Sequence, residues 1–297
     1  MSKYRLVALL VIVSIVLLAF TLLVRDIHDL EYVVPDFVEE VLIQEEKYPT
    51  MLFVGDVMLG RHVESLMEEN GIEFPFKNVA LVLETPDVTV GNFEGIVSEE
   101  HVHSPSMTFQ FSIQPDYLRQ LHERGFDVLS LANNHSFDYG LPALLHTRSL
   151  CILYSLVCGG TPAELDEYST QILQVGSKKV GIIFIHTVFK QPDVDTLKKL
   201  IEKLNQESDV QFSFVHWGVE YDLIHSTTQE DLAKIMIDQG IDAVIGHHPH
   251  VVQDIGFYKN KPIFYSLGNF IFDQYFSNDV QEGLGVSLRF KKDSIEY

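Results

Sequence analysis

Side chains that can bind a cation follow several of the short apolar runs in this sequence. In chain order they are Asp56, Asn92, Glu94, Asn134, His135, His216, His248 and His250. Carboxylate, amide and imidazole groups are ligands for divalent cations such as Mn²⁺, Fe²⁺ and Zn²⁺. If the apolar runs are strands of an open α/β sheet, their C-terminal ends form the edge where such folds place their sites. We therefore predict a metal or phosphate site assembled from five strand ends.

The segment His248-Pro249-His250 carries the densest part of this pattern. In extended backbone, alternate side chains lie on the same face, so both imidazoles can reach one centre while His247 points away. Pro249 stiffens the turn between them. We predict that His248 and His250 contact a metal ion or a phosphate group.

Several of these residues also have purely structural interpretations. Asp56 follows Gly55 and could cap a helix, Asn134 belongs to a pair of turn-forming asparagines, and Glu94 could be exposed in a glycine-flanked loop. Asp138 either caps the next helix or orients His135.

A second set of residues is expected around the site. Trp217 follows His216 and is interpreted as a ligand-contacting wall, with core packing as the alternative. Glu220 and Asn92 are candidates for substrate contact or for support of the ligands, and Arg61 for anion binding. The remaining histidines outside the pattern are interpreted as ordinary residues: His28, His62, His101, His103, His122, His146, His186 and His225.

The elements that must position these residues alternate between strand and helix patterns. Helical spacing occurs in 116–125, around Leu197–Leu204 and around Leu232–Met236. Strands alternating with helices predict an α/β layered fold. The expected strands are 51–56, 87–95, 126–132, 180–187, 210–218, 242–250 and 262–272.

The N-terminus carries a different signal. Residues 6–24 form an uncharged run of 19 residues, long enough to span a bilayer as a helix. Lys3 and Arg5 precede it and acidic residues follow, so the positive-inside rule places the rest of the chain outside the cytoplasm. We predict a cytoplasmic tip and signal anchor (1–25), an acidic tether (26–48) and an extracytoplasmic domain (49–297); a cleaved signal peptide is the alternative.

Composition excludes some functions. The chain has 297 residues with 21 Lys and Arg against 42 Asp and Glu. A net charge of −21 argues against nucleic-acid binding, which needs basic residues to neutralise phosphates. The only cysteines, Cys151 and Cys158, are either a disulfide, which the predicted exported location would allow, or two buried thiols.

Six segments in order resemble the motifs of the CapA-type poly-γ-glutamate capsule synthesis family. They are GDVMLGR (55–61), VGNFEG (90–95), LANNHSFDYG (131–140), HWGVEY (216–221), GHHPHVVQ (246–253) and YSLGNFIFD (265–273). The family resembles the calcineurin-like metallophosphoesterases, so the resemblance implies a layered αββα sandwich with metal ions at the strand ends. It implies a protein that serves, with other membrane subunits, in the synthesis or export of an anionic envelope polymer.

Carried over by motif, the resemblance implies metal ligation by Asp56, Glu94, Asn134, His216, His248 and His250. If the protein is an enzyme, His135 or His250 would serve as acid or electrophile. The chain departs from the metallophosphoesterase pattern at Met58, where a histidine is usual, at Asn92, where an aspartate is usual, and in 141–175, which reads unlike the expected helix and strand. A metal-dependent phosphatase or phosphodiesterase and a non-catalytic assembly subunit are the alternative functions.

Overall fold

The computed structural model describes residues 48–105, 108–292 and 294–297. The predicted membrane segment and all but the last residue of the acidic tether lie outside these ranges. Among the described residues, no helix combines the length and apolarity needed to cross a membrane.

Two sheets form the centre of the fold. The first has the strand order β15-β14-β1-β2-β5-β6, with β13 also paired to β1. Strands β1, β2, β5 and β6 run parallel, and β14 and β15 are antiparallel additions beyond β1. Its strands are β1 (Thr50–Val57), β2 (Val88–Phe93), β5 (Val128–Ser130), β6 (Val157–Gly159), β13 (Asn269–Ile271), β14 (Val286–Phe290) and β15 (Ile295–Glu296).

The second sheet has the order β11-β12-β10-β9-β8-β7. Its four inner strands are parallel, and the two outer strands are antiparallel to their neighbours. Its strands are β7 (Thr170–Val175), β8 (Lys178–His186), β9 (Val210–His216), β10 (Ala243–His247), β11 (Ile255–Tyr258) and β12 (Lys261–Phe264).

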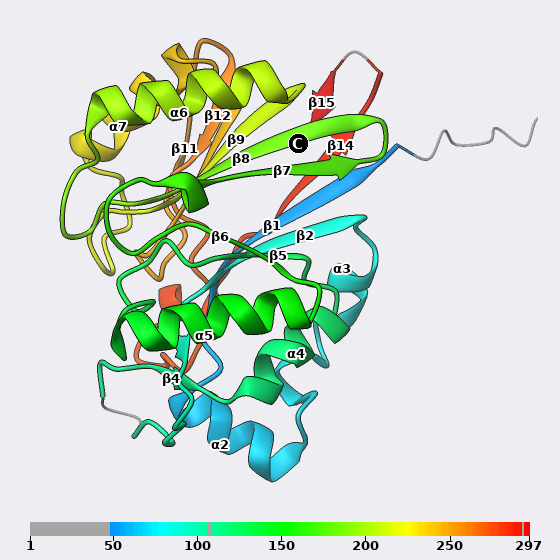
Figure 1. Cartoon of the computed structure of the whole chain (residues 1–297), viewed down its shortest axis with the longest axis vertical. Coiled ribbons are helices and arrows are strands. Elements are labelled where there is room, and N and C mark those ends of the chain that lie inside the picture. Colours follow the sequence, from blue (N-terminus) through cyan, green and yellow to red (C-terminus); the bar gives the residue numbers. More distant parts are fainter. Residues whose placement is uncertain (1–47, 106–107, 293) are drawn as a thin grey trace, which may run out of the picture. The chain divides into compact units, whose positions relative to one another are not determined.

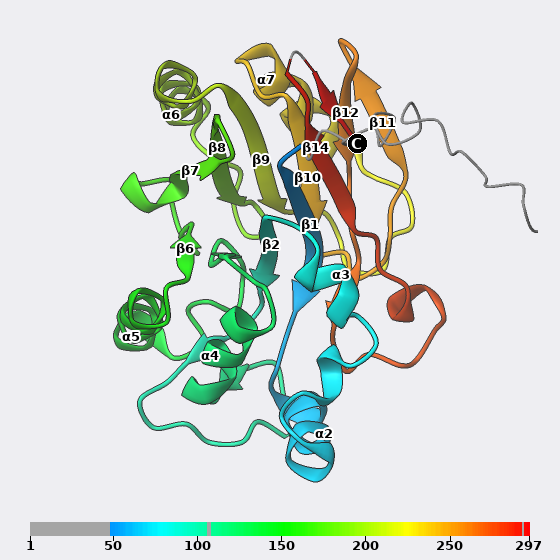
Figure 2. The ribbon, with the colours of Figure 1, turned by 90° about the vertical axis from the view of Figure 1, so that its right-hand side faces the viewer.

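Helices cover the outer face of each sheet, so that four layers follow one another from α6 and α7 to α4 and α5 (Figures 1 and 2). The helices on the first sheet are α2 (Arg61–Asn70), α3 (Ala80–Glu84), α4 (Pro115–Glu123) and α5 (Gly140–Leu153). Those on the second are α6 (Val194–Glu207) and α7 (Thr227–Asp238). A short pair, β3 (Ile96–Val97) and β4 (Ser112–Ile113), lies beside the first sheet's helices, and one-turn 3₁₀ helices occur at 74–76, 167–169 and 279–281.

Each interface between layers has its own apolar core. Phe53 of β1 meets Phe212 and Phe214 between the two sheets. On the far face of the second sheet, Leu197 and Ile201 of α6 occupy one helical stripe and pack in the core that includes the strand residues Ile183 and Ile185. Burying one such side chain contributes about 1.5–3 kcal/mol. The inner strands are therefore apolar on both faces until they reach their C-terminal ends.

The structure confirms the predicted α/β class and corrects two details. The expected strand 262–272 is divided: β12 belongs to the second sheet and β13 to the first, because the chain crosses between sheets at residues 265–268. The segment 141–175 does hold a helix and a parallel strand, α5 and β6, although its apolar residues gave no clear helical stripe.

Cys151 of α5 and Cys158 of β6 form a disulfide, which settles the alternative that the sequence left open. The bond joins the end of a helix to the strand that follows it, seven residues further along the chain.

We expect reduction of this disulfide to lower the free energy of unfolding by about 2 kcal/mol, because the cross-link restricts a short loop of the unfolded chain. Urea unfolding of the full chain with and without reductant measures the change. A Cys151→Ala/Cys158→Ala variant should match the reduced protein and no longer respond to reductant. Equal midpoints for the oxidised and reduced protein would contradict the expectation.

Candidate metal centre

Three histidines end three neighbouring strands of the second sheet. His186 of β8 pairs in register with His216 of β9, and His216 pairs in register with His247 of β10. Each follows a residue of the inter-sheet core by two positions: Phe184, Phe214 and Ile245. Because side chains alternate along a strand, all three imidazoles face the first sheet.

Asp56 faces them from β1 because of a β-bulge. Leu52 and Val54 belong to the core on the helix side of the first sheet, so regular alternation would direct Asp56 to that side too. The register between β1 and β2 shifts between Phe53 and Asp56, and such a bulge re-aims the side chains that follow it. Gly55 allows the backbone at Gly268 to approach β1 closely, since a Cβ at residue 55 would lie 1.9 Å from the carbonyl oxygen of Gly268.

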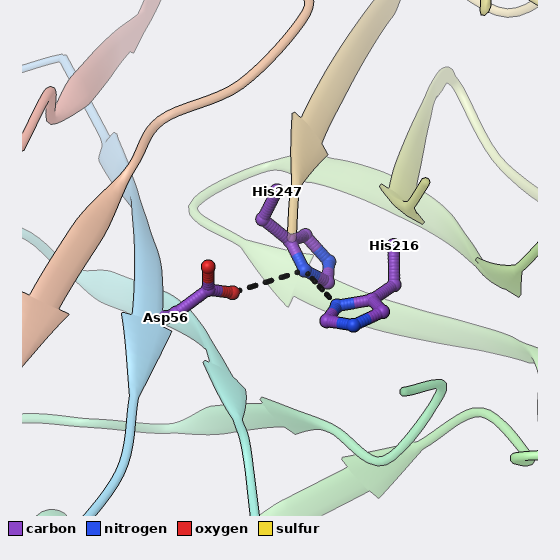
Figure 3. Close-up of side chains that lie close together, drawn as sticks. All are labelled: Asp56, His216 and His247. Carbon is purple, nitrogen blue, oxygen red and sulfur yellow. Dashed lines mark hydrogen bonds and ion pairs between the residues drawn. The ribbon is translucent and has the colours of Figure 1, made fainter. Parts of the chain in front are cut away.

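The Asp56 carboxylate connects the two sheets (Figure 3). Oδ1 accepts a hydrogen bond from the Asn92 side-chain amide at 2.8 Å and lies 3.3 Å from His247 Nδ1. His247 Nδ1 is in turn 2.8 Å from His216 Nδ1. On the far side of the ring, His216 Nε2 lies 2.6 Å from the side-chain oxygen of Asn134. A chain of polar contacts thus runs from β1 to the loop after β5.

His248 and His250 also reach the site, although not through extended backbone. β10 ends at His247, and the next residues turn with φ values of 101° at His248 and 59° at His250. The expectation that His247 points away was therefore wrong, because alternation does not continue past the strand end. Each such conformation costs about 1–3 kcal/mol and is typical of functional sites.

Glu94 provides a second buried carboxylate. Its side chain has no solvent exposure, and Oε1 has no hydrogen-bond partner. Oε1 lies 3.5 Å from His250 Nε2 and 3.8 Å from His135 Nε2. His250 Nδ1 donates to the side-chain oxygen of Asn269 at 2.9 Å, so Nε2 is the ring nitrogen directed at Glu94.

His135 is held in place by its neighbours. Its Nδ1 donates to Asp138 Oδ2 at 2.9 Å, and the same oxygen accepts the backbone N–H of Phe111. The Phe111 ring stacks on the imidazole at 3.8 Å. The carboxylate of Asp138 therefore orients His135, as one of the two alternatives predicted, and it does not cap α5, whose N-cap is Tyr139.

Three expected site residues have other surroundings. The Trp217 indole is buried in the core under α6 and α7 and donates to the carbonyl of Tyr265, so the interpretation as a ligand-contacting wall was wrong. The Arg61 guanidinium forms an ion pair with Asp273, donates a hydrogen bond to the carbonyl of Thr108, and lies over the ring of Phe111. Glu220 is exposed but lies near His248 and His250.

Burial and the neighbouring charges set the protonation of the centre. Burial favours the neutral form of Asp56, but hydrogen bonds from His247 and His250 outweigh this and hold the pKa of Asp56 well below its usual range. Burial lowers the pKa of His248 to about 3, and that of His216 also lies well below the usual value. Burial and then the charge of Asp56 raise the pKa of Glu94 well above its ordinary range. At neutral pH the imidazoles of His216 and His248 are therefore neutral, as metal ligation requires.

The residues fit a divalent cation. Three groups of carboxylates and imidazoles at the centre have ligand atoms within 4.8 Å of one another: Asp56, His216 and His247; Asp56, Glu94 and His250; Glu220, His248 and His250. Three polar atoms of the centre are buried without a hydrogen-bond partner: Glu94 Oε1, His247 Nε2 and His248 Nδ1. Such atoms destabilise the folded state unless a ligand contacts them.

The structure thus brings together Asp56, Asn92, Glu94, Asn134, His135, His216, His248 and His250. Sequence reasoning missed His247, His186 and Asn269. The signal for the two histidines was present, because FIH (184–186), FVH (214–216) and IGH (245–247) place histidine at the same point of three strands.

Two α/β sheets with helices outside and ligand residues at their facing C-terminal ends define a fold that solved structures share. A hypothetical protein from Thermus thermophilus matches with a TM-score of 0.56 and 18% identity, covering 84% of this chain and 96% of that one. A phosphatase from Mycoplasma pneumoniae matches with a TM-score of 0.51 and 16% identity, covering 74% and 72%. These similarities show the fold alone.

The chain belongs to the family described as bacterial capsule synthesis protein PGA_cap, which matches residues 50–274. It is 34% identical over 252 residues to the capsule biosynthesis protein CapA of Bacillus anthracis, covering 78% of this chain and 61% of that protein. It is 31% identical over 241 residues to the PGA biosynthesis protein CapA of Bacillus subtilis, covering 75% and 63%. The matched region spans about three fifths of each of these relatives.

We expect His216→Ala and His248→Ala to lose bound metal, because each removes an imidazole from one of the groups at the centre. Elemental analysis of the purified full chain measures the content, with His122→Ala, at an exposed position of α4, as the matched control. Loss of a ligand should weaken binding by at least about tenfold. Unchanged metal content in both variants would refute the assignment of the centre.

We expect Glu94→Gln to change how the stability of the metal-free protein depends on pH. Between the ordinary value of 4.5 and its raised native pKa, native Glu94 holds a proton that the unfolded chain has lost. The free energy of unfolding therefore falls as pH rises through this window. With chelator present, the melting temperature of Glu94→Gln should gain on that of the wild type as the pH rises above the ordinary pKa of 4.5.

The exposed Glu100→Gln variant serves as the control for this measurement. Parallel pH profiles for the wild type and Glu94→Gln would contradict the raised pKa.

Proposed function

We propose that this chain takes part in the synthesis or export of poly-γ-glutamate or a related anionic polymer of the capsule or envelope. The observation that supports this most is the family match to residues 50–274, which contains all the buried ligand residues described above. The similarity to proteins named for capsule and PGA biosynthesis points to the same role.

The proposed location is the outer side of the cell membrane, with a single N-terminal helix as anchor. Residues 6–24 have the length and apolarity for that helix. The Cys151–Cys158 disulfide supports an extracytoplasmic body, because such bonds persist mainly in oxidising compartments. The proposed partners are other membrane subunits of a polymer synthesis complex and the polymer itself, and not nucleic acid.

The centre has the groups for hydrolysis or transfer at a carbonyl or phosphoryl group. A divalent cation held by Asp56, Glu94 and the histidines of the centre, with Asn134 as a further oxygen ligand, would supply Lewis acidity. Mn, Fe and Zn are the metals that this mixture of ligands suits. His135 can donate a proton from Nε2 when protonated, since its Nδ1 is held by Asp138 and the ring is thereby oriented. His250 is the second candidate for this role.

A metal-dependent phosphatase or phosphodiesterase is the second candidate function. It is favoured by the pairing of Asn134 with His216 and by the position of His135 next to Glu94, 3.8 Å from Oε1. A non-catalytic assembly subunit is the third. It is favoured by Met58, which packs in the apolar core where metallophosphoesterases usually have a histidine ligand.

Replacement of the chromosomal copy by His248→Ala in the organism that encodes the chain tests these functions. Under the first function we expect the cell-associated γ-glutamyl polymer to fall by about tenfold or more. His122→Ala should leave the polymer unchanged, and immunoblotting should show equal protein levels.

The other outcomes distinguish the alternatives. Hydrolysis of bis-p-nitrophenyl phosphate by the purified full chain, abolished by His248→Ala, with no change in polymer, would favour the phosphodiesterase. Loss of polymer on deletion of the chain, but not in His248→Ala, would favour the assembly subunit.

A further inference from the structure

A second cluster of ligand-type side chains lies on α2, away from the metal centre. Glu64 and Glu68 are one turn apart on this helix, and His103 lies beside them from the loop after β3. Their ligand atoms are within 4.8 Å of one another. None of these three residues belongs to the groups of the metal centre.

Glu64 is the buried member of this cluster. Its side chain has no exposure to solvent. Oε1 is well satisfied, since Gln114 Nε2 donates to it at 2.8 Å and His101 Nε2 lies at 2.8 Å. Oε2 has no hydrogen-bond partner. Among the described residues, the ion-pair partners of Glu64 are the two imidazoles of His101 and His103, with no lysine or arginine.

Without a ligand, this arrangement destabilises the folded protein. A buried carboxylate oxygen without a donor loses its hydration without compensation. Glu68 adds a second negative charge at the i+4 position of the same helix, where like charges destabilise. The cluster therefore has an excess of negative charge and an unsatisfied oxygen that points toward it.

The spacing of the atoms fits a shared cation better than a direct contact. Glu64 Oε2 lies 3.2 Å from His103 Nδ1, yet the ring does not make a hydrogen bond along that line. Two ligands at about 2.0–2.2 Å from one ion are separated by about 3–4 Å. His103 Nε2 lies 3.5 Å from the hydroxyl of Ser65, which leaves Nδ1 as the nitrogen on the carboxylate side.

We propose that Glu64, Glu68 and His103 form a second cation site, which binds a first-row divalent ion such as Zn²⁺. Two carboxylates and one imidazole are a donor set for such ions, and the exposed sides of Glu68 and His103 leave room for water as further ligand. The bound ion joins α2 to the loop after β3 through His103.

A Zn²⁺ titration of the full chain in the His248→Ala background tests the site separately from the metal centre. We expect isothermal titration calorimetry to resolve one binding event whose affinity falls by at least about tenfold in Glu68→Gln and in His103→Asn, while Zn²⁺ binding by the remaining ligands of the metal centre is the same in every variant. Both residues are partly exposed, so neither variant threatens the core; circular dichroism checks folding. The matched control is Glu69→Gln, which makes the same charge change at the next position of α2.

Two results would overturn the proposal. Equal Zn²⁺ binding, or none, in the wild-type cluster and in both variants would mean that Glu64, Glu68 and His103 hold no divalent ion. An equal loss in Glu69→Gln would mean that Zn²⁺ associates with the acidic surface of α2 and not with a defined site. Neither result depends on whether the chain serves in capsule synthesis, because the readout is binding at residues outside the metal centre.

Discussion

The burial of the Asp56 carboxylate between two sheets is the constraint on which the rest of the site depends. A charged oxygen with no access to water must be compensated by nearby donors. In this protein the donors come from both sheets: the Asn92 amide lies on β2, and the imidazole of His247 and the backbone N–H of His248 belong to β10 and the turn after it. The position of the first sheet on the second is therefore tied to the ionised state of one side chain.

The same contacts explain why the centre is arranged to receive a cation. Burial keeps His216 and His248 neutral, while Asp56 stays ionised and Glu94 is pushed toward its protonated form. The cluster thus holds one firm negative charge and several unused lone pairs. In a chain of net charge −21, a cation at this point would supply local positive charge beside the Asp56 carboxylate.

Much of the site could be predicted because strand ends are local features of the sequence. Asp56, Glu94 and His216 each follow an apolar run, and that pattern alone places them at one edge. The sequence did not predict correctly the direction in which some side chains point. Asp56 faces the second sheet only because of a bulge that depends on pairing between β1 and β2, and His247 was misdirected because β10 ends where alternation was assumed to continue. The prediction for Trp217 was wrong for a similar reason. Its indole lies in the core because the helices α6 and α7 cover it, and that packing is not a local feature of the sequence.

The two sides of the candidate centre differ in the ligand types that they offer. Met58 stands where the resemblance to metallophosphoesterases predicts a histidine ligand, and its sulfur accepts the backbone N–H of Gly60 within the core. The groups with ligand atoms near His250 are the carboxylates of Asp56, Glu94 and Glu220 and the imidazole of His248. Replacing imidazole by carboxylate shifts a site toward harder ions. The side of the centre around His250 therefore offers mainly carboxylate oxygens to a cation, whereas the group of Asp56, His216 and His247 offers two imidazoles and one carboxylate.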